Sequence, residues 1–399
     1  MAHNARATMA TTVSVSGSDR LRDLQAFDDT KAGVKGLVDA GVTTVPYFFR
    51  HPPDPLPVAA PSEHDAAIPV IDLAKADVDR EWVVADLRAA AETVGFFQVV
   101  NHGVAGVLME EVLAVVRRFN EEPLAAKVPF YTRDSARKVR FNSNFDLFRS
   151  PAANWRDTLF MEMAPDAPSP EEIPPACRGV AEEYTSAVRG LGERLFELLS
   201  EALGLPAGHL GRDAGCMDGL SMAAHYYPAC PEPEATMGTS RHSDPSFLTV
   251  LLQDASGGLQ ALLERPRRWV DVPPVAGALV VNVGDLIQLM SNDRLRSVEH
   301  RVAASGAGPR VSVACFFRPE YTSTRSYGPI AVASGARPAA AAAVYRSTTA
   351  WEFLAHYNGK GLDGRSALEH FRLPDPPASS VSSTAEHAAD AHARTDVAI

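Results

Sequence analysis

From about Ser221 onward the chain is a series of short apolar runs of strand type, and this series constrains the fold more than any other feature. The runs read SMAAHYY, FLTVLLQD, GLQALLE, WVDVPP, ALVVNVG, VEHRVAA and RVSVACFF. Gly, Pro, Asn and Asp separate them at intervals of about ten residues, which is the pattern of an antiparallel sandwich or barrel. This part of the chain therefore predicts a β core.

Helical patterns flank the β core on both sides. Apolar residues recur at helical intervals within 21–38, 82–91, 108–119 and 180–199, and TTAWEFLAHYNGKGL is helical near the C-terminus. Two further strands are predicted at IPVIDL and GFFQVVNHG, ahead of the β core. Because apolar stripes of this width usually face a protein's own interior, we expect the helices to pack against the β core.

The same patterns divide the chain into five segments. They are a disordered tail at 1–20, an N-terminal module of helices and strands at 21–220, the β core at 221–330, a C-terminal helical segment at 331–377 and a disordered tail at 378–399. Residues 1–18 faintly resemble a transit peptide, but their one arginine, Arg6, favours a plain tail. One β core framed by helices is a simpler account than two independent domains.

Charge and composition argue against several classes of protein. The 399 residues carry a formal net charge of -11, whereas a nucleic-acid partner would need a basic stripe. No apolar run approaches the roughly 18 residues of a membrane-spanning helix. The four cysteines (Cys177, Cys216, Cys230 and Cys315) form no C-x-x-C pair, which favours reduced thiols. We therefore expect a cytoplasmic monomer with a small-molecule substrate and neither nucleic acid nor membrane as partner.

Two histidines and one aspartate form a candidate metal site. His242 and Asp244 are one residue apart, so in an extended segment their side chains share a face. His300 follows Asp244 by 56 residues in another run of strand type, and pairing of the two strands would bring it close. Two imidazoles and one carboxylate suit Fe(II) oxygen chemistry, although zinc also accepts this set. H-x-D alone is a weak signal, because it also arises by chance in turns.

A candidate anion site follows ten residues after His300. Arg310 and Ser312 share a strand face, and an arginine inside a β core is costly unless it meets an anion. The guanidinium group matches a carboxylate in bidentate fashion, and the Ser312 hydroxyl adds a hydrogen bond. Tyr227 can donate to the same group. A dicarboxylate could thus chelate the metal at one end and reach Arg310 at the other.

The order H-x-D, H and R-x-S resembles the plant Fe(II)/2-oxoglutarate-dependent dioxygenase superfamily, and the resemblance covers nearly the whole chain. IPVIDL and GFFQVVNHGV are similar to its N-terminal module, and HYYPACPEP, WVDVPP and NVGDLIQLMSND to its core. SNFDLF, WRDTLF and YRSTTAWEFLAHYNGKGLDGRSALEHF resemble a narrower branch, the 1-aminocyclopropane-1-carboxylate oxidase homologues, which includes DIBOA-glucoside dioxygenases. Many superfamily members carry Asn at the position of His225, so His225 is expected to support the site without binding the metal.

The resemblance implies a distorted double-stranded β-helix, or jelly roll, with flanking helices. It also implies Fe(II) as cofactor, 2-oxoglutarate and O2 as co-substrates, and ascorbate as reductant. Oxidation of a small plant specialised metabolite, most often hydroxylation, would accompany decarboxylation of 2-oxoglutarate to succinate. An aromatic or benzoxazinoid-like substrate is the narrower expectation, with a wall of phenylalanines that comprises Phe141, Phe145, Phe160, Phe316 and Phe317.

Three alternatives remain open at this point. Each phenylalanine is as consistent with ordinary core packing as with a substrate wall, and adjacent Phe316 and Phe317 cannot both face one side of a strand. The chain could instead oxidise an amino-acid-like substrate without 2-oxoglutarate, as true 1-aminocyclopropane-1-carboxylate oxidases do while carrying R-x-S. It could also be a catalytically silent receptor, although the intact triad and R-x-S argue against that.

Overall fold

The computed structural model describes residues 17–58, 68–330, 342–362 and 365–374. Most of the predicted N-terminal tail and all of the predicted C-terminal tail lie outside the described residues. Helix α1 (Gly17–Asp29) begins inside the expected tail, because its buried Leu24 and Phe27 join a small apolar cluster with Phe48 and Phe49. In the described residues, no helix is long and apolar enough to cross a membrane.

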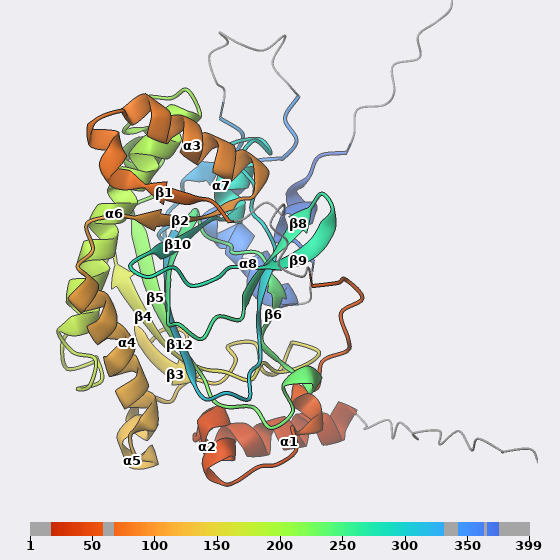
Figure 1. Cartoon of the computed structure of the whole chain (residues 1–399). Helices are drawn as coiled ribbons and strands as arrows, with labels where there is room; N and C mark the ends of the chain where they lie inside the picture. Colours follow the sequence, from red (N-terminus) through yellow and green to blue (C-terminus); the bar gives the residue numbers. More distant parts are fainter. Residues whose placement is uncertain (1–16, 59–67, 331–341, 363–364, 375–399) are drawn as a thin grey trace, which may run out of the picture.

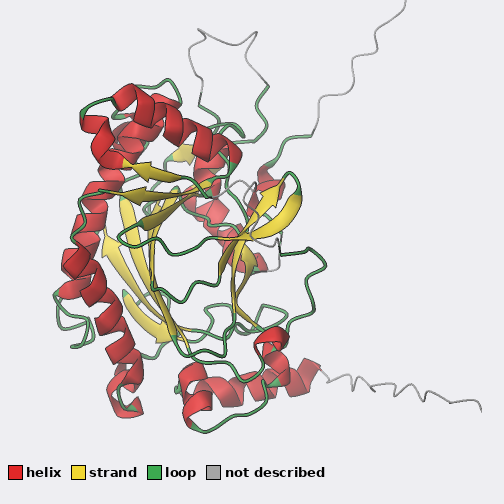
Figure 2. Ribbon diagram, viewed as in Figure 1, coloured by secondary structure: helices red, strands yellow, loops and turns green. Residues whose placement is uncertain are grey.

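The structure is built on one large and one small β-sheet (Figures 1 and 2). The large sheet has the order β1 (Val70–Asp72), β2 (Phe96–Val100), β10 (Leu279–Val283), β7 (Leu248–Gln253), β12 (Arg310–Arg318), β5 (Gly219–Tyr227), β4 (Asp157–Ala164) and β3 (Val139–Asn142). Only the β1–β2 pair among them is parallel. The small sheet has the order β6 (Met237–His242), β11 (His300–Ala303), β8 (Leu259–Glu264) and β9 (Arg267–Asp271).

The inner faces of the two sheets pack against each other. Phe96 and Val280 from the large sheet share one apolar cluster with Ala261 and Val302 from the small sheet. Two sheets of mainly antiparallel strands packed in this way form the predicted jelly roll, so the expected fold class is confirmed.

Helices cover the outer face of the large sheet (Figure 1). They are α3 (Arg80–Thr93), α4 (Gly106–Glu121) and α6 (Val180–Ala202), and their buried residues belong to the largest apolar cluster. The other α-helices of the described residues are α2 (Gly33–Asp39), α5 (Leu124–Lys127), α7 (Asp285–Met290) and α8 (Ala350–Lys360). Strands β13 (Ser326–Tyr327) and β14 (Thr348–Thr349) form a separate short two-stranded sheet. The apolar stripes at 82–91, 108–119 and 180–199 thus face the core, as predicted.

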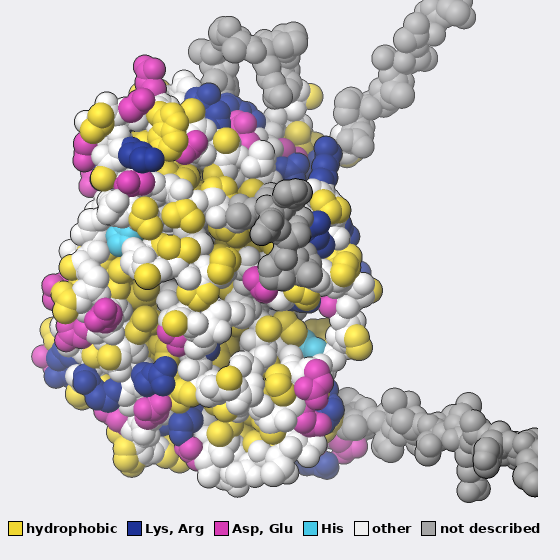
Figure 3. All heavy atoms as spheres, in the orientation of Figure 1, with side chains coloured by type: hydrophobic (Ala, Val, Ile, Leu, Met, Phe, Trp, Pro, Cys, Tyr) yellow, Lys and Arg dark blue, Asp and Glu magenta, His cyan; other side chains and the backbone are white. Residues whose placement is uncertain are grey.

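The N-terminal half contributes strands to the same sheet as the β core. Strands β3 and β4 precede residue 220, yet β4 pairs along its length with β5. The expected segment boundary near residue 220 therefore crosses a continuous sheet and stays a prediction. On the face of the molecule in Figure 3, basic and acidic side chains are interspersed.

Candidate metal centre

The three predicted metal ligands come together at one end of the small sheet. His242 ends β6 and pairs directly with His300, the first residue of β11, while Asp244 follows β6 by two residues. Asp244 Oδ1 lies 3.5 Å from Nε2 of His242 and 3.5 Å from Nε2 of His300. The ligand atoms of all three residues lie within 4.8 Å of one another, close enough for one metal ion.

Hydrogen bonds leave one ligand atom of each histidine free to face the others. His242 Nδ1 lies 2.8 Å from the carbonyl oxygen of Ser240, and His300 Nδ1 lies 3.2 Å from that of Val298. A carbonyl oxygen can only accept a hydrogen bond, so Nδ1 of each ring carries the proton. Each Nε2 therefore presents its lone pair toward Asp244, the orientation that a metal requires.

The carboxylate of Asp244 is oriented by two buried donors. Thr249 Oγ1 donates to Asp244 Oδ2 at 2.6 Å, and Asn282 Nδ2 donates to the same oxygen at 2.8 Å. Oδ1 is left to face the two histidines. Thr249 and Asn282 belong to the neighbouring strands β7 and β10, where they pair directly. Two residues of the large sheet thus orient Asp244, the metal ligand that follows strand β6 of the small sheet.

Electrostatics favour the metal-binding protonation states of Asp244 and His300. Burial on its own would raise the pKa of Asp244, but His300 and His242 together with the hydrogen bond from Asn282 hold it well below its usual value. Burial, with a further contribution from His242, lowers the pKa of His300 to about 4. An ionised aspartate beside a neutral His300 is the state that binds a divalent cation.

The predicted anion site lies on the inner face of the large sheet. Arg310 is 4% exposed, and its Nη1 donates to Ser312 Oγ at 2.8 Å. Its Nε donates to Gly257 O at 2.7 Å and its Nη2 to Gln253 Oε1 at 3.1 Å. The guanidinium carbon lies 4.9 Å from the centre of the Tyr227 ring, so Arg310, Ser312 and Tyr227 form one group, as predicted.

No carboxylate in the described part of the chain lies within ion-pair distance of Arg310. All three hydrogen-bond acceptors of its guanidinium group are neutral oxygens, from Gly257, Gln253 and Ser312. A buried arginine without a counter-charge is unfavourable unless an anion completes the site. The arrangement fits the carboxylate end of a dicarboxylate.

His225 lies between the anion site and β4. It pairs with Ser312 on one side and with Thr158 on the other, and its Nδ1 is 3.0 Å from Thr158 Oγ1. Burial lowers the pKa of His225 well below its usual value, and the nearby Arg156 and Arg310 lower it further. A neutral imidazole adjacent to Ser312 is consistent with the supporting role expected of it, and His225 is outside the metal cluster.

The five predicted phenylalanines do not form one wall. Phe316 lies four residues after Ser312, so both side chains are on the inner face of β12. Phe160 lies two residues after Thr158 on β4 and pairs with Ala223 of β5, so its side chain is on the inner face of the same sheet. Phe141 and Phe317 point the other way into the helix-covered core, where Phe317 contacts Phe196. The substrate role expected of these two is therefore not supported, because strand alternation turns them toward the helices.

Phe145 is half exposed in the loop that follows β3. Adjacent Phe316 and Phe317 point to opposite faces, as alternation along β12 predicts. Of the five, Phe160 and Phe316 are kept as candidates for contact with substrate.

Several residues of the site had no signal in the sequence analysis. Thr249 and Asn282 belong to apolar runs in which a single polar residue on a strand is common. Tyr357 from α8 donates to the carbonyl oxygen of Ser243 at 3.3 Å, which ties the C-terminal helix to the segment between His242 and Asp244. The contacts of Asn282 and Tyr357 join parts of the chain that are 38 and 114 residues apart, so no local motif could identify them, whereas Thr249 follows Asp244 by five residues.

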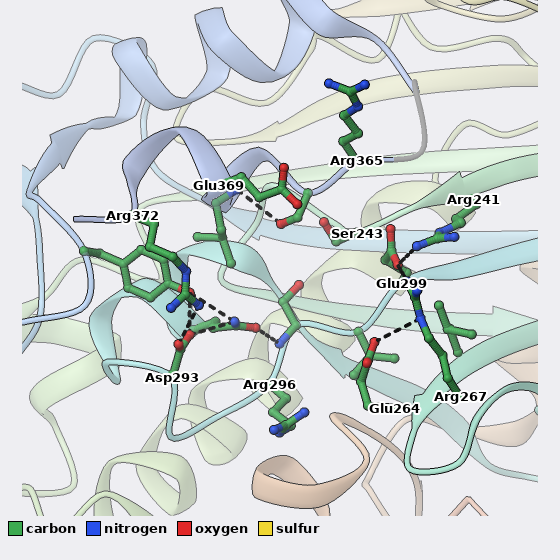
Figure 4. A pocket seen from close by; sticks show the side chains of 17 residues that line it. Arg241, Ser243, Glu264, Arg267, Asp293, Arg296, Glu299, Arg365, Glu369 and Arg372 are labelled. Carbon is green, nitrogen blue, oxygen red and sulfur yellow. Dashed lines mark hydrogen bonds and ion pairs between the residues drawn. The ribbon is translucent and has the colours of Figure 1, made fainter. Parts of the chain in front are cut away.

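A surface pocket of about 460 Å³ lies between residues 241–243, 262–267 and 296–299 on one side and residues 288–293 and 365–372 on the other (Figure 4). Arg241 and Glu299 line it and form an ion pair, and they are the immediate neighbours of His242 and His300 in the sequence. Because alternate side chains of a strand point to opposite faces, this pocket is separated from the ligand atoms by the sheet itself.

Comparison with known proteins identifies the family to which both halves of the chain are similar. Residues 219–319 match the model of the 2OG-Fe(II) oxygenase superfamily. Residues 68–198 match the model described as non-haem dioxygenase in morphine synthesis N-terminal. The first match includes His242, Asp244, His300, Arg310 and Ser312.

Curated relatives and solved structures give the same result. A 1-aminocyclopropane-1-carboxylate oxidase homolog 1 of Arabidopsis thaliana is 50% identical over 90% of this chain and 98% of its own length. A homolog from Solanum lycopersicum is 46% identical over 89% and 97%. The crystal structure of JOX2 in complex with 2OG, Fe and JA matches with a TM-score of 0.73 and 29% identity, over 86% of this chain and 98% of that one. A rice dioxygenase for auxin oxidation matches with a TM-score of 0.62 and 26% identity, over 77% and 100%.

Proposed function

Because the chain belongs to the 2OG-Fe(II) oxygenase superfamily, we propose that it oxidises a small plant specialised metabolite of aromatic, benzoxazinoid-like character. The enzyme class itself, a 2-oxoglutarate-dependent dioxygenase that uses Fe(II), follows from the family. The observation that supports the proposal best is the preset orientation of the triad. Both Nε2 atoms and Asp244 Oδ1 converge on one point, while every other polar atom of the three side chains has a partner.

In the proposed mechanism, His242, Asp244 and His300 hold the metal on one face. Bound Fe(II) supplies the activation of dioxygen that couples 2-oxoglutarate decarboxylation to substrate oxidation. Burial and the neighbouring charges favour a neutral His300 and an ionised Asp244, the states in which both would bind the metal. Thr249 and Asn282 hold the carboxylate in place.

Arg310, Ser312 and Tyr227 are proposed to bind the distal carboxylate of 2-oxoglutarate. The planar guanidinium group can present two parallel N–H bonds to a carboxylate, and Ser312 can donate a third. The family uses this dicarboxylate with Fe(II), so the zinc alternative is not favoured. Ascorbate is the expected reductant that keeps the metal ferrous.

The substrate is proposed to contact Phe160 and Phe316 on the inner face of β4 and β12. Apolar rings beside the metal would exclude water and favour an aromatic ligand. The neighbours named for JA and for auxin oxidation support a small organic substrate as a class. We further propose that the enzyme acts as a monomer in the cytoplasm and needs no macromolecular partner.

An untargeted assay tests the proposal. The pure protein is incubated with Fe(II), ascorbate, 2-oxoglutarate and a plant metabolite extract, and mass spectrometry seeks compounds that gain one oxygen or lose two hydrogens. Succinate formation must rise together with consumption of an aromatic compound. Consumption of non-aromatic compounds alone would overturn the aromatic proposal, and turnover without 2-oxoglutarate would favour the 1-aminocyclopropane-1-carboxylate type of oxidation. Absence of succinate formation with any fraction would favour a silent receptor.

A further inference from the structure

Arg156 is a second buried arginine on the inner face of the large sheet. It directly precedes β4, is 7% exposed, and its Nη1 donates to Thr239 Oγ1 at 2.9 Å. Thr239 Oγ1 lies 3.2 Å from Tyr227 Oη. Since β4 and β12 flank β5, Arg156 and Arg310 approach Tyr227 from two different strands. Arg156 thus borders the proposed 2-oxoglutarate site, to which it is linked through Thr239 and Tyr227.

The guanidinium group of Arg156 lacks a counter-charge. Its Nε is buried without a hydrogen-bond partner, and no carboxylate in the described residues lies within ion-pair distance. By contrast, Arg140 and Arg318, from β3 and β12, both pair with Glu162. The buried Asp146 accepts at Oδ2 from the Ser150 hydroxyl and from Leu362 N, its Oδ1 has no hydrogen-bond partner in the described residues, and it forms no ion pair with Arg156 there. A buried, unpaired charge is strongly unfavourable, so the site is incomplete without an anion.

Two further buried donors lie on the same two segments as Arg156 and Thr239. Asn154 Nδ2 and Ser240 Oγ are buried and have no hydrogen-bond partner. The two residues are in contact, because Ser240 N donates to Asn154 Oδ1 at 2.7 Å. Residues 154–156 and 239–240 thus carry three buried donor atoms without a partner, and such donors suit a ligand that carries acceptors only, such as an ionised carboxylate.

The formal charges around the proposed metal site also indicate that Arg156 needs an anionic partner. Fe(II) contributes two positive charges and Asp244 one negative, while His242 and His300 are neutral ligands. A doubly charged 2-oxoglutarate and Arg310 bring the sum to zero. Arg156 then adds one positive charge that neither the metal nor the co-substrate balances, and the remaining ligand of the reaction is the substrate.

We propose that the substrate carries a carboxylate and that Arg156 binds it, with Asn154 and Ser240 as additional donors. The inference rests on the proposed function and narrows its aromatic class to aromatic acids. Thr239 is a positioning residue, because it accepts from Arg156 Nη1 while Arg156 Nε, which has no partner in the described residues, is left to the substrate.

Direct binding tests the proposal without turnover. Anaerobic protein loaded with Fe(II) and saturating 2-oxoglutarate is titrated calorimetrically with benzoate, phenylacetate and cinnamate at about pH 7.5, where carboxylates are ionised. The primary amide of each acid is titrated in parallel. At least one acid is expected to bind more tightly than its amide by roughly thirtyfold or more, the lower end of the cost of removing one partner of a buried charge pair.

Variants assign this preference to Arg156. Arg156→Gln should abolish the preference for the acid over its amide. Arg156→Lys should keep part of this preference, because the charge remains without the planar fork. Thr239→Val should weaken the preference, because it removes the group that positions Arg156. The control is Arg194→Gln, which removes a surface arginine of α6 that pairs with Asp77, and it should retain the full preference. Preference that survives in Arg156→Gln, or no acid that binds more tightly than its amide, would overturn the proposal.

Titration with 2-oxoglutarate distinguishes failure of the proposed function from failure of the substrate-carboxylate proposal. Wild-type protein that fails to bind 2-oxoglutarate would contradict the proposed function, whatever the acids do. If Arg156→Gln weakens 2-oxoglutarate binding as much as acid binding, Arg156 belongs to the co-substrate site and the substrate-carboxylate proposal fails. Unchanged 2-oxoglutarate affinity with lost acid binding is the expected result.

Discussion

His242 and His300 face each other across the β6–β11 pair, with ring centroids 4.2 Å apart and ring planes inclined by 50°. This pairing lets two residues that are far apart in the sequence present Nε2 to one point. The rings are held by the carbonyl oxygens of Ser240 and Val298, so groups of the protein itself orient both Nε2 atoms.

The first prediction concerns the metal ligands themselves. His242→Ala, Asp244→Ala and His300→Ala should each abolish turnover and lower the iron content, because a three-ligand site has no spare donor. Iron is measured by inductively coupled plasma mass spectrometry after anaerobic loading, and folding by circular dichroism. Near wild-type iron content and activity in any one variant would remove that residue from the site.

The second prediction concerns the proposed 2-oxoglutarate site. Arg310→Ala should weaken 2-oxoglutarate binding by about 2–5 kcal/mol, because it removes one partner of a desolvated charge pair. Arg310→Lys should recover only part of this loss, since an ammonium group lacks the fork. The KM for 2-oxoglutarate is the measurement, and an unchanged KM in Arg310→Ala would contradict the assignment.

A third prediction concerns the two donors to Asp244. Thr249→Val and Asn282→Leu each remove one hydrogen bond to Oδ2 and free the carboxylate to rotate. Metal affinity should fall by roughly 10–100-fold in either variant, the usual effect of losing a partner that orients a ligand. Competition with a fluorescent chelator measures it. Wild-type affinity in both variants would show that Asp244 needs no such support.

The fourth prediction concerns pH. Burial lowers the pKa of His102 and of His51. His102 Nδ1 accepts from Val104 N, so protonation there would break that bond. Below the unfolded pKa of about 6.5, the unfolded chain takes up protons that the folded chain does not bind, so the free energy of unfolding falls with falling pH.

Urea denaturation of the metal-free protein between about pH 7.5 and pH 5.5 measures this loss. His102→Gln should show a shallower decline, because one of the titrating groups is gone while the side chain can still accept a hydrogen bond. A decline of equal slope in wild type and variant would contradict the role of His102.

The fifth prediction concerns packing between α6 and β12. A Cβ on Gly192 would overlap the ring of Phe317, which is fully buried. Gly192→Ala should therefore lower the free energy of unfolding by about 1–3 kcal/mol. Gly190 lies two residues earlier on the same helix, and a Cβ there meets nothing within 4 Å. Gly190→Ala should be neutral or stabilising by up to about 1 kcal/mol, and equal effects of the two changes would refute the packing argument.

Sequence reasoning succeeded where a side chain's direction follows from alternation along one strand. Arg310 and Ser312 share a face, Phe316 and Phe317 do not, and the structure agrees on both. It failed where direction depends on another element. Which face of β12 carries the site is set by the helices on the other side, so Phe317 could not be assigned from its run alone.

Local irregularity is a second limit on the sequence reasoning. The register of β6 against β11 shifts between the pairs His300–His242 and Val302–Thr239, which indicates a bulge. The bulge places Thr239 and His242, three residues apart, on one face, although regular alternation would separate them. No residue pattern in this segment predicts the extra residue of the bulge. The contact between Thr239 and Arg156 therefore could not be predicted from residue spacing.

The pairing of β2 with β10 joins Phe96 to Asn282, residues 186 positions apart in the chain. During synthesis on the ribosome, β1 and β2 must therefore wait with one open edge until most of the protein has emerged. Contacts of such long range make folding slow and leave the nascent chain exposed to aggregation. Asn282, which hydrogen-bonds Asp244, lies on β10, and the third ligand, His300, follows it at the start of β11. The three-ligand site therefore cannot assemble until β11 has been synthesised, so binding of iron by all three ligands has to follow synthesis of most of the β core.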